Sequence, residues 1–260
     1  MPLEEIINRQ GIIISAPASG AGKTTVTLGL INAFARKGSV QPFKSGPDYI
    51  DPKFQSVAAD RPSYNLDTWA MSSSDILNMI GMVGPSDICI AEGSMGLFDG
   101  VISKGAGGNG STADLASITN WPVILVVDCA KQAQSVAALI TGFNSFRHDI
   151  TIGGVILNNI SSKRHEALVV SEVSKTKVPI LGVVPRSNEL TIPERHLGLV
   201  QAEDLSNLEQ LIFKLGTLIE ENCDLEAIAC TARKSSPAIP NLQKITPPAQ
   251  RIAIALSLIH

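Results

Sequence analysis

The chain has 260 residues, 24 acidic and 21 basic side chains, a net charge of −3 and 44% hydrophobic residues. With 17% charged residues and a mean hydropathy of +0.19, it has enough apolar material to bury a core, which excludes intrinsic disorder. A general nucleic-acid or membrane-surface binder needs a concentrated positive field, which this composition lacks. No apolar stretch approaches the roughly 20 residues that span a bilayer. Residues 1–10 lack the apolar core of a secretory signal, so we expect a cytoplasmic protein.

Short apolar runs alternate with helical patterns along the chain. We expect buried strands in the runs that begin at Gly11, Ile88, Val123, Gly154 and Pro179. Helical periodicity predicts helices over residues 22–37, 73–83, 132–146, 163–175 and 203–221. This alternation predicts an α/β fold with a doubly wound, mostly parallel sheet, whose ligands bind at the carboxyl ends of the strands. The four cysteines show no CxxC spacing, and Cys89 and Cys129 lie in apolar runs, so we expect these two to be buried thiols.

The sequence SAPASGAGKTT (15–25) lies between the first expected strand and the first expected helix. A glycine-rich loop in this place forms an anion cradle from backbone N–H groups, while a lysine neutralises phosphate and a hydroxyl can bind magnesium. Pro17 replaces the usual first glycine of the motif, so the match is imperfect. The context still predicts nucleoside triphosphate binding, by Ser19, Gly20, Ala21, Gly22, Lys23, Thr24 and Thr25.

Acidic and basic residues follow three other expected strands. Glu92 ends one strand where a magnesium-binding carboxylate is expected, and Asp128 ends another; capping of the next helix is the alternative for both. The segment PFKSGPDYIDP (42–52) brings Lys44, Asp48 and Asp51 together in a loop after a short strand, and EGSMGLFDG (92–100) adds Asp99. These charges can bind magnesium, a terminal phosphate or a carboxylate substrate, whereas a solvated turn is the alternative for the first segment.

Four blocks in this order resemble the cobyrinate or hydrogenobyrinate a,c-diamide synthases: KSGPDYIDP, NLDTW (65–69), EGSMGLFDG and IPERHLGL (192–199). These enzymes are glutamine-dependent amidoligases of cobalamin biosynthesis. The resemblance implies a P-loop NTPase-type fold similar to dethiobiotin synthetase, with ATP and Mg²⁺ as cofactors. In the family, ATP phosphorylates carboxylates of a corrinoid or other tetrapyrrole, and ammonia then displaces phosphate to give amides. Family members commonly pair, so a homodimer is expected by analogy, without nucleic-acid or membrane partners.

The resemblance also implies roles for single residues. Lys23 and Lys44 would neutralise the transferred phosphate, and Asp48 and Asp99 would order the substrate or the acyl phosphate, with these two roles exchangeable. Magnesium would be held by Thr24, Asp51 and Glu92. The nucleotide base would lie beside Asn158, Asn159, Pro185 and Arg186, for which turn formation is the alternative. Glu194, Arg195 and His196 resemble a late substrate-side motif of the family, and a plain surface residue is the alternative for His196.

We expect a synthetase domain over residues 1–230, a linker over 231–250 and the first strand of a glutamine amidotransferase domain at 251–260. Neither Cys223 nor Cys230 has the surroundings of a glutaminase nucleophile, so we expect free ammonia or a separate glutaminase as the nitrogen source. Three other interpretations stay open. They are a related tetrapyrrole amidoligase (cobyric acid synthase or nickel-sirohydrochlorin a,c-diamide synthase), an inactive truncated remnant, and a partition-type regulatory ATPase. The last class carries a lysine where this loop has Ala18.

Overall fold

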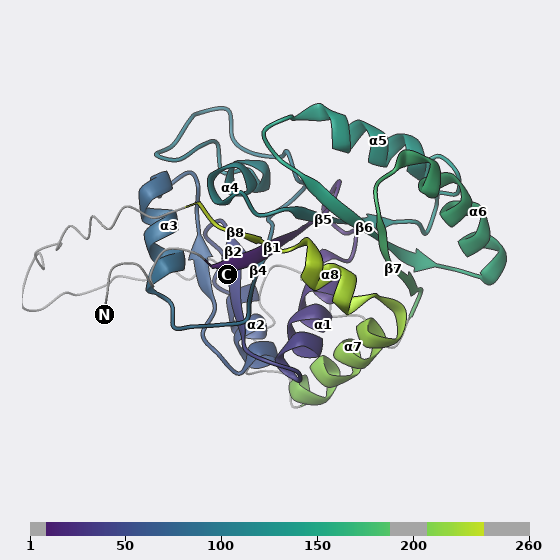
Figure 1. Cartoon of the computed structure of the whole chain (residues 1–260), viewed down its shortest axis with the longest axis horizontal. Coiled ribbons are helices and arrows are strands. Elements are labelled where there is room, and N and C mark those ends of the chain that lie inside the picture. The colour runs from purple at the N-terminus through teal and green to yellow at the C-terminus, as the bar shows by residue number, and fades with distance from the viewer. Residues whose placement is uncertain (1–8, 188–206, 237–260) are drawn as a thin grey trace, which may run out of the picture.

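One twisted sheet organises the computed structural model, which describes residues 9–187 and 207–236 (Figure 1). Its strands follow the order β3-β2-β4-β1-β5-β6-β7, and β8 pairs with the start of β1. All described pairs along this order are parallel, and β8 is antiparallel to β1. The strands are β1 (Gln10–Ser15), β2 (Val40–Ser45), β3 (Tyr64–Leu66), β4 (Ile88–Glu92), β5 (Val123–Asp128), β6 (Ile152–Ile160), β7 (Ile180–Pro185) and β8 (Arg233–Lys234). The expected doubly wound, mostly parallel sheet is confirmed.

Helices cover both faces of the sheet (Figure 1). The elements are α1 (Lys23–Ala35), α2 (Asp51–Ala59), α3 (Ser73–Met82), α4 (Thr112–Thr119), α5 (Val136–Phe146), α6 (Lys163–Val173), the 3₁₀ helix η2 (Ser174–Thr176), α7 (Leu208–Asn222) and α8 (Leu225–Thr231). Several begin at an N-cap side chain that accepts a backbone N–H, as Ser72 does for α3 and Ser162 for α6. No helix within the described ranges is long and apolar enough to cross a membrane.

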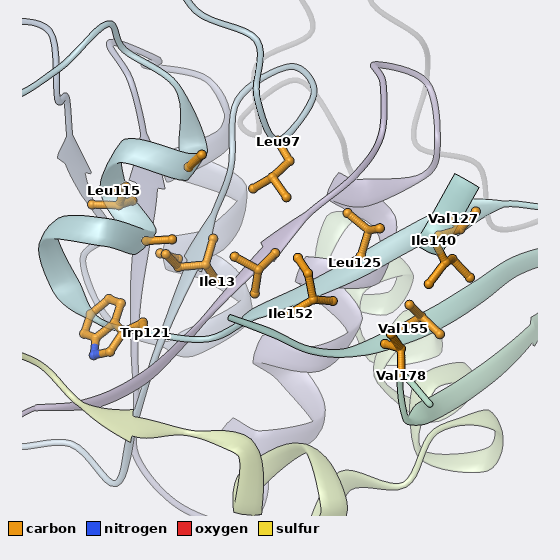
Figure 2. Packing of buried hydrophobic residues seen from close by; sticks show 14 of the residues in the cluster. Ile13, Leu97, Leu115, Trp121, Leu125, Val127, Ile140, Ile152, Val155 and Val178 are labelled. Atoms are coloured by element: carbon orange, nitrogen blue, oxygen red, sulfur yellow. The ribbon is translucent and has the colours of Figure 1, made fainter. Parts of the chain in front are cut away.

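Strand alternation divides the core into two layers. On β1, Ile13 packs with residues of α3 to α6, whereas Ile12 and Ile14 pack with α1, α2, α7 and α8. Figure 2 shows part of the first layer, which includes Leu115 of α4, Ile13 of β1 and Leu125 of β5. Because both faces are covered, the strands are apolar throughout, which is why they appear in the sequence as continuous apolar runs. Cys89 and Cys129 are buried in this layer, as expected.

The structure differs from the sequence expectations around the second strand and at the end of the described chain. Lys44 lies within β2, not in the loop after it, and Asp51 is the first residue of α2. The sheet continues to Lys234, four residues beyond the expected domain boundary at residue 230, because β8 pairs with Gln10 and Gly11. The block at 192–199, the rest of the expected linker and the expected terminal strand lie outside the described residues.

Candidate active site

The glycine-rich loop joins β1 to α1, and two of its glycines adopt left-handed backbone conformations. Gly20 has φ of 80° and Gly22 has φ of 85°, so both positions favour glycine. Gly22 is also closely packed, because a Cβ there would lie 2.2 Å from Nδ2 of Asn158. The same Nδ2 donates a hydrogen bond of 2.9 Å to the carbonyl of Ala21. Strand β6 thus holds the loop in place, and the loop presents the N-terminus of α1 as an anion site.

The loop opens onto a cavity of about 1150 Å³ at the carboxyl edge of the sheet. Its wall combines the β1–α1 loop, the segment from the end of β2 to the start of α2, Ser94 and Met95 after β4, the ends of β6 and β7, and two single residues, Ala130 and Leu218. Most sequence-predicted site residues line it, namely Ser19, Gly20, Gly22, Lys23, Thr24, Thr25, Lys44, Asp48, Asp51, Asn158, Asn159, Pro185 and Arg186. Three predicted residues do not line it: Ala21 and Glu92, which are buried, and Asp99, which is exposed.

A buried cluster of charges lies at the floor of the cavity, where Lys44 and Asp51 line the cavity and Glu92 does not. The Nζ atom of Lys44 lies 2.6 Å from Oδ2 of Asp51 and 3.2 Å from Oε1 of Glu92. Lys44 is 4% exposed, Asp51 5% and Glu92 0%. Burial alone lowers the pKa of Lys44, but the charges of Glu92 and Asp51 outweigh burial and raise that pKa above its usual value. Lys44 is therefore a fixed cation at neutral pH.

Lys23 and Thr24 connect this floor to the phosphate loop. The Lys23 ammonium donates a hydrogen bond of 3.1 Å to the carbonyl of Met95, and the Thr24 hydroxyl donates one of 2.7 Å to Oε1 of Glu92. Burial lowers the pKa of Lys23, and the charge of Glu92 opposes that shift. An anionic ligand stabilises a buried cation in a cavity wall, because the ligand replaces the hydration that burial removes.

Asp48 and Asp99 hold loops of the site in place. Oδ1 of Asp48 accepts the backbone N–H groups of Ile50 (2.8 Å) and Asp51 (3.1 Å), which orders the start of α2. Oδ2 of Asp99 accepts the N–H of Gly96 at 2.8 Å within the loop that follows β4. Asp48 also lines the cavity, whereas Asp99 does not. Their predicted substrate roles stay predictions.

On the other side of the cavity, the side chains of the two predicted asparagines form hydrogen bonds with other parts of the chain. Asn158 holds the phosphate loop, and Nδ2 of Asn159 donates a hydrogen bond of 2.8 Å to Oδ1 of Asp128. The N–H of Arg186 donates to the carbonyl of Ile160 at 2.9 Å, which extends β7 beside β6. Asp128 therefore orders the turn after β5, and base binding by this group of residues stays a prediction.

Gln55 is a site residue that the sequence did not reveal. Its Nε2 donates a hydrogen bond of 2.8 Å to Oε2 of Glu92, and its Oε1 accepts one of 2.7 Å from the Ser63 hydroxyl. Gln55 is fully buried on α2, four residues after Asp51 and on the same helix face. The spacing of four residues could reveal Gln55 from the sequence, but only if a helix is expected to begin at Asp51.

The donor atoms of the floor are compatible with magnesium. Within the described part of the chain, no group of three or more His, Cys, Asp or Glu side chains could hold a metal ion. Magnesium commonly binds one or two protein oxygens and takes the rest of its ligands from phosphates and water. The Thr24 hydroxyl and the Glu92 carboxylate, which contact each other, offer hard oxygen donors of this kind. Asp51 offers a further carboxylate, which forms an ion pair with Lys44 in this structure.

The fold and this site define the class: a parallel sheet with a phosphate loop after β1 and charged residues at the neighbouring strand ends is a P-loop nucleotide-binding domain. The family described as the CobQ/CobB/MinD/ParA nucleotide binding domain matches residues 12–200, and the chain belongs to this family.

Curated relatives confirm the resemblance seen in the sequence blocks. The chain is 46% identical over 247 residues to a hydrogenobyrinate a,c-diamide synthase of Rhodobacter capsulatus, with 95% of this chain and 57% of the relative covered. A relative of the same name from Brucella ovis is 45% identical over 251 residues, with the same coverage. The chain thus spans a little over half the length of these relatives. A solved structure, the MinC:MinD cell division protein complex of Aquifex aeolicus, aligns with 85% of this chain and 93% of that chain at 16% identity, with a TM-score of 0.48.

Proposed function

We propose that the chain performs the ATP-dependent amidation of the a- and c-side-chain carboxylates of hydrogenobyrinate or cobyrinate. The proposal rests on the position of Lys44, which is a second buried cation beside the phosphate loop. Lys23 alone serves nucleotide binding, but joining a carboxylate to a phosphate brings two anions together and needs additional positive charge. The name of the relatives, hydrogenobyrinate a,c-diamide synthase, supports a tetrapyrrole with several carboxylates as the acceptor.

The reaction has two steps. A substrate carboxylate oxygen attacks the γ-phosphorus of ATP, the bond from that phosphorus to the ADP oxygen breaks, and an acyl phosphate forms. Ammonia then attacks the acyl carbon, the bond to the phosphate oxygen breaks, and the amide and hydrogen phosphate are released, with one ammonia proton on the phosphate. Lys23 and Lys44 neutralise charge in the first step, while the phosphate loop and α1 orient the triphosphate.

Bound at Thr24 and Glu92, magnesium would neutralise developing charge on the phosphates. Gln55 keeps Glu92 oriented by binding its other oxygen. Asp48 orders the loop that faces the acceptor. The ammonia source and the pairing of two copies stay predictions.

The release of ADP tests this proposal against a simple nucleotide switch. We expect hydrogenobyrinic acid, added with Mg-ATP and ammonium chloride, to stimulate ADP release, because phosphate transfer needs the carboxylate acceptor. A Lys44→Met variant should bind Mg-ATP and lose the stimulation. ADP release that is the same with and without the tetrapyrrole would contradict an amidoligase and favour a regulatory ATPase.

A further inference from the structure

Ser45 is a buried cavity residue to which neither the sequence blocks nor the proposed reaction assigns a role. It ends strand β2, is 1% exposed and lines the cavity. Its Oγ atom has no hydrogen-bond partner among the described residues. Most buried hydroxyls in proteins are hydrogen-bonded, since an unsatisfied one costs free energy. Ser15, Ser45 and Thr68 carry the buried hydroxyls without a partner among the described residues, and of these three Ser45 alone lines the cavity, where a ligand atom can complete it.

The strand geometry separates Ser45 from the charged floor. Successive side chains of a strand point to opposite faces, so Ser45 lies on the face of Phe43 while Lys44 points to Glu92 and Asp51. The next residue, Gly46, has φ of 81°, and a Cβ there would approach Oγ of Ser94 to 3.7 Å. The chain therefore turns sharply after Ser45, directly at the cavity.

The order of the strands places Ser45 on the acceptor side. The phosphate loop follows β1, and β2 lies two strands away across β4. Adjacent strands are about 4.8 Å apart, so the end of β2 lies about 10 Å from the end of β1. A carboxylate that attacks the terminal phosphorus must approach from the side opposite ADP, and we assign that side to the end of β2, which lines the cavity away from the phosphate loop.

We propose that the Ser45 hydroxyl donates a hydrogen bond to the substrate carboxylate, at the oxygen that becomes the carbonyl oxygen of the acyl phosphate. When ammonia attacks the acyl carbon, the electron pair of the C=O bond moves onto this oxygen, and it returns when phosphate leaves. Ser45 stabilises the negative charge in between. This role rests on the proposed amidoligase function.

A Ser45→Ala variant of the full chain tests the proposal with Mg-ATP, hydrogenobyrinic acid and ammonium chloride. Loss of one donor to such an oxyanion typically lowers the rate about 10²- to 10³-fold, and we expect this loss in amide formation. The KM for ATP should not change. The melting temperature of the free protein should not fall, because Oγ has no hydrogen-bond partner in the described part of the chain. Ser45→Thr keeps the donor and should recover most of the rate.

Thr68 supplies a matched control. It is 1% exposed, its Oγ1 also has no described partner, and it does not line the cavity. Thr68→Val should form amide at the normal rate. Equal rates for Ser45→Ala and the unmodified chain would overturn the role of Ser45 alone. A lower melting temperature together with equal rate losses in both variants would show a structural role instead. No amide from the unmodified chain would overturn both this role and the proposed function.

Discussion

Lys44 illustrates how a single side chain can carry both stability and chemistry. Its ammonium lies between two buried carboxylates, so each of the three charges depends on the others. A buried ion pair adds little net stability over an apolar pair, but removing one partner leaves an uncompensated charge. An apolar floor could be equally stable, so we attribute the charged cluster to its chemistry.

Lys44→Met should lower the free energy of unfolding by about 3–5 kcal/mol at pH 8, because Asp51 and Glu92 then face each other without a cation. Burial lowers the pKa of Lys44, but the charges of Glu92 and Asp51 outweigh burial and raise it above the ordinary value of 10.5. A lysine whose pKa is higher in the folded state adds stability below its unfolded pKa, so the difference between the two proteins should shrink as the pH rises above about 10.5.

Urea unfolding at several pH values measures this effect. The matched control is Lys163→Met, since the Lys163 side chain is 94% exposed. Its effect should stay within about 0.5 kcal/mol at every pH. Equal losses in the two variants, or a loss for Lys44→Met that does not depend on pH, would contradict the buried cluster.

At the scale of elements, the phosphate loop depends on a neighbour from distant sequence. Strand β6 contributes Asn158, whose amide binds the loop carbonyl of Ala21, 137 residues away along the chain. The absence of a side chain at Gly22 leaves room for that amide. The start of α1 is thus fixed by a contact between two elements as well as by its own backbone.

Gly22→Ala should abolish detectable Mg-ATP binding in calorimetric titration. The added Cβ meets Asn158, and a left-handed conformation costs a non-glycine residue about 1–2 kcal/mol. Gly142→Ala is the matched glycine control, because Gly142 is exposed in α5 with nothing within 4 Å of its Cβ position. That variant should bind ATP normally and be more stable by about 0.5–1 kcal/mol. Normal ATP affinity in Gly22→Ala would contradict the loop geometry.

The sequence predicted the long elements and missed the short ones for physical reasons. The apolar strands at Ile88 and Val123 are buried on both faces, so their composition alone reveals them. Helix α2 follows a segment rich in proline and glycine, which hid its beginning at Asp51. Strand β8 consists of only two residues, both of them exposed, and it forms because it pairs with β1. Pairing of this kind leaves no periodicity in the local sequence.

At the scale of the whole molecule, the site exists only when the sheet is complete. Glu92 is in register with Ile14 on one side and with Lys44 on the other, so β4 places the carboxylate between the phosphate loop and β2. The motifs predicted which residues carry charge. They did not predict that Lys44 pairs with Asp51 and Glu92, that Gln55 donates a hydrogen bond to Glu92, or that the Ser45 hydroxyl has no hydrogen-bond partner among the described residues. Those facts depend on strand register and side-chain direction, which a single sequence does not encode locally.

The most direct test of the central claim is mass spectrometry of hydrogenobyrinic acid after incubation with the purified chain, Mg-ATP and ammonium chloride. Free ammonia is used so that the result does not depend on a glutaminase. We expect two carboxyl groups to become amides, with formation of ADP and with no product when ATP is omitted or when Lys23→Ala replaces the unmodified chain. An unchanged tetrapyrrole in the presence of bound ATP would contradict the claim that this site is an amidoligase for that ring.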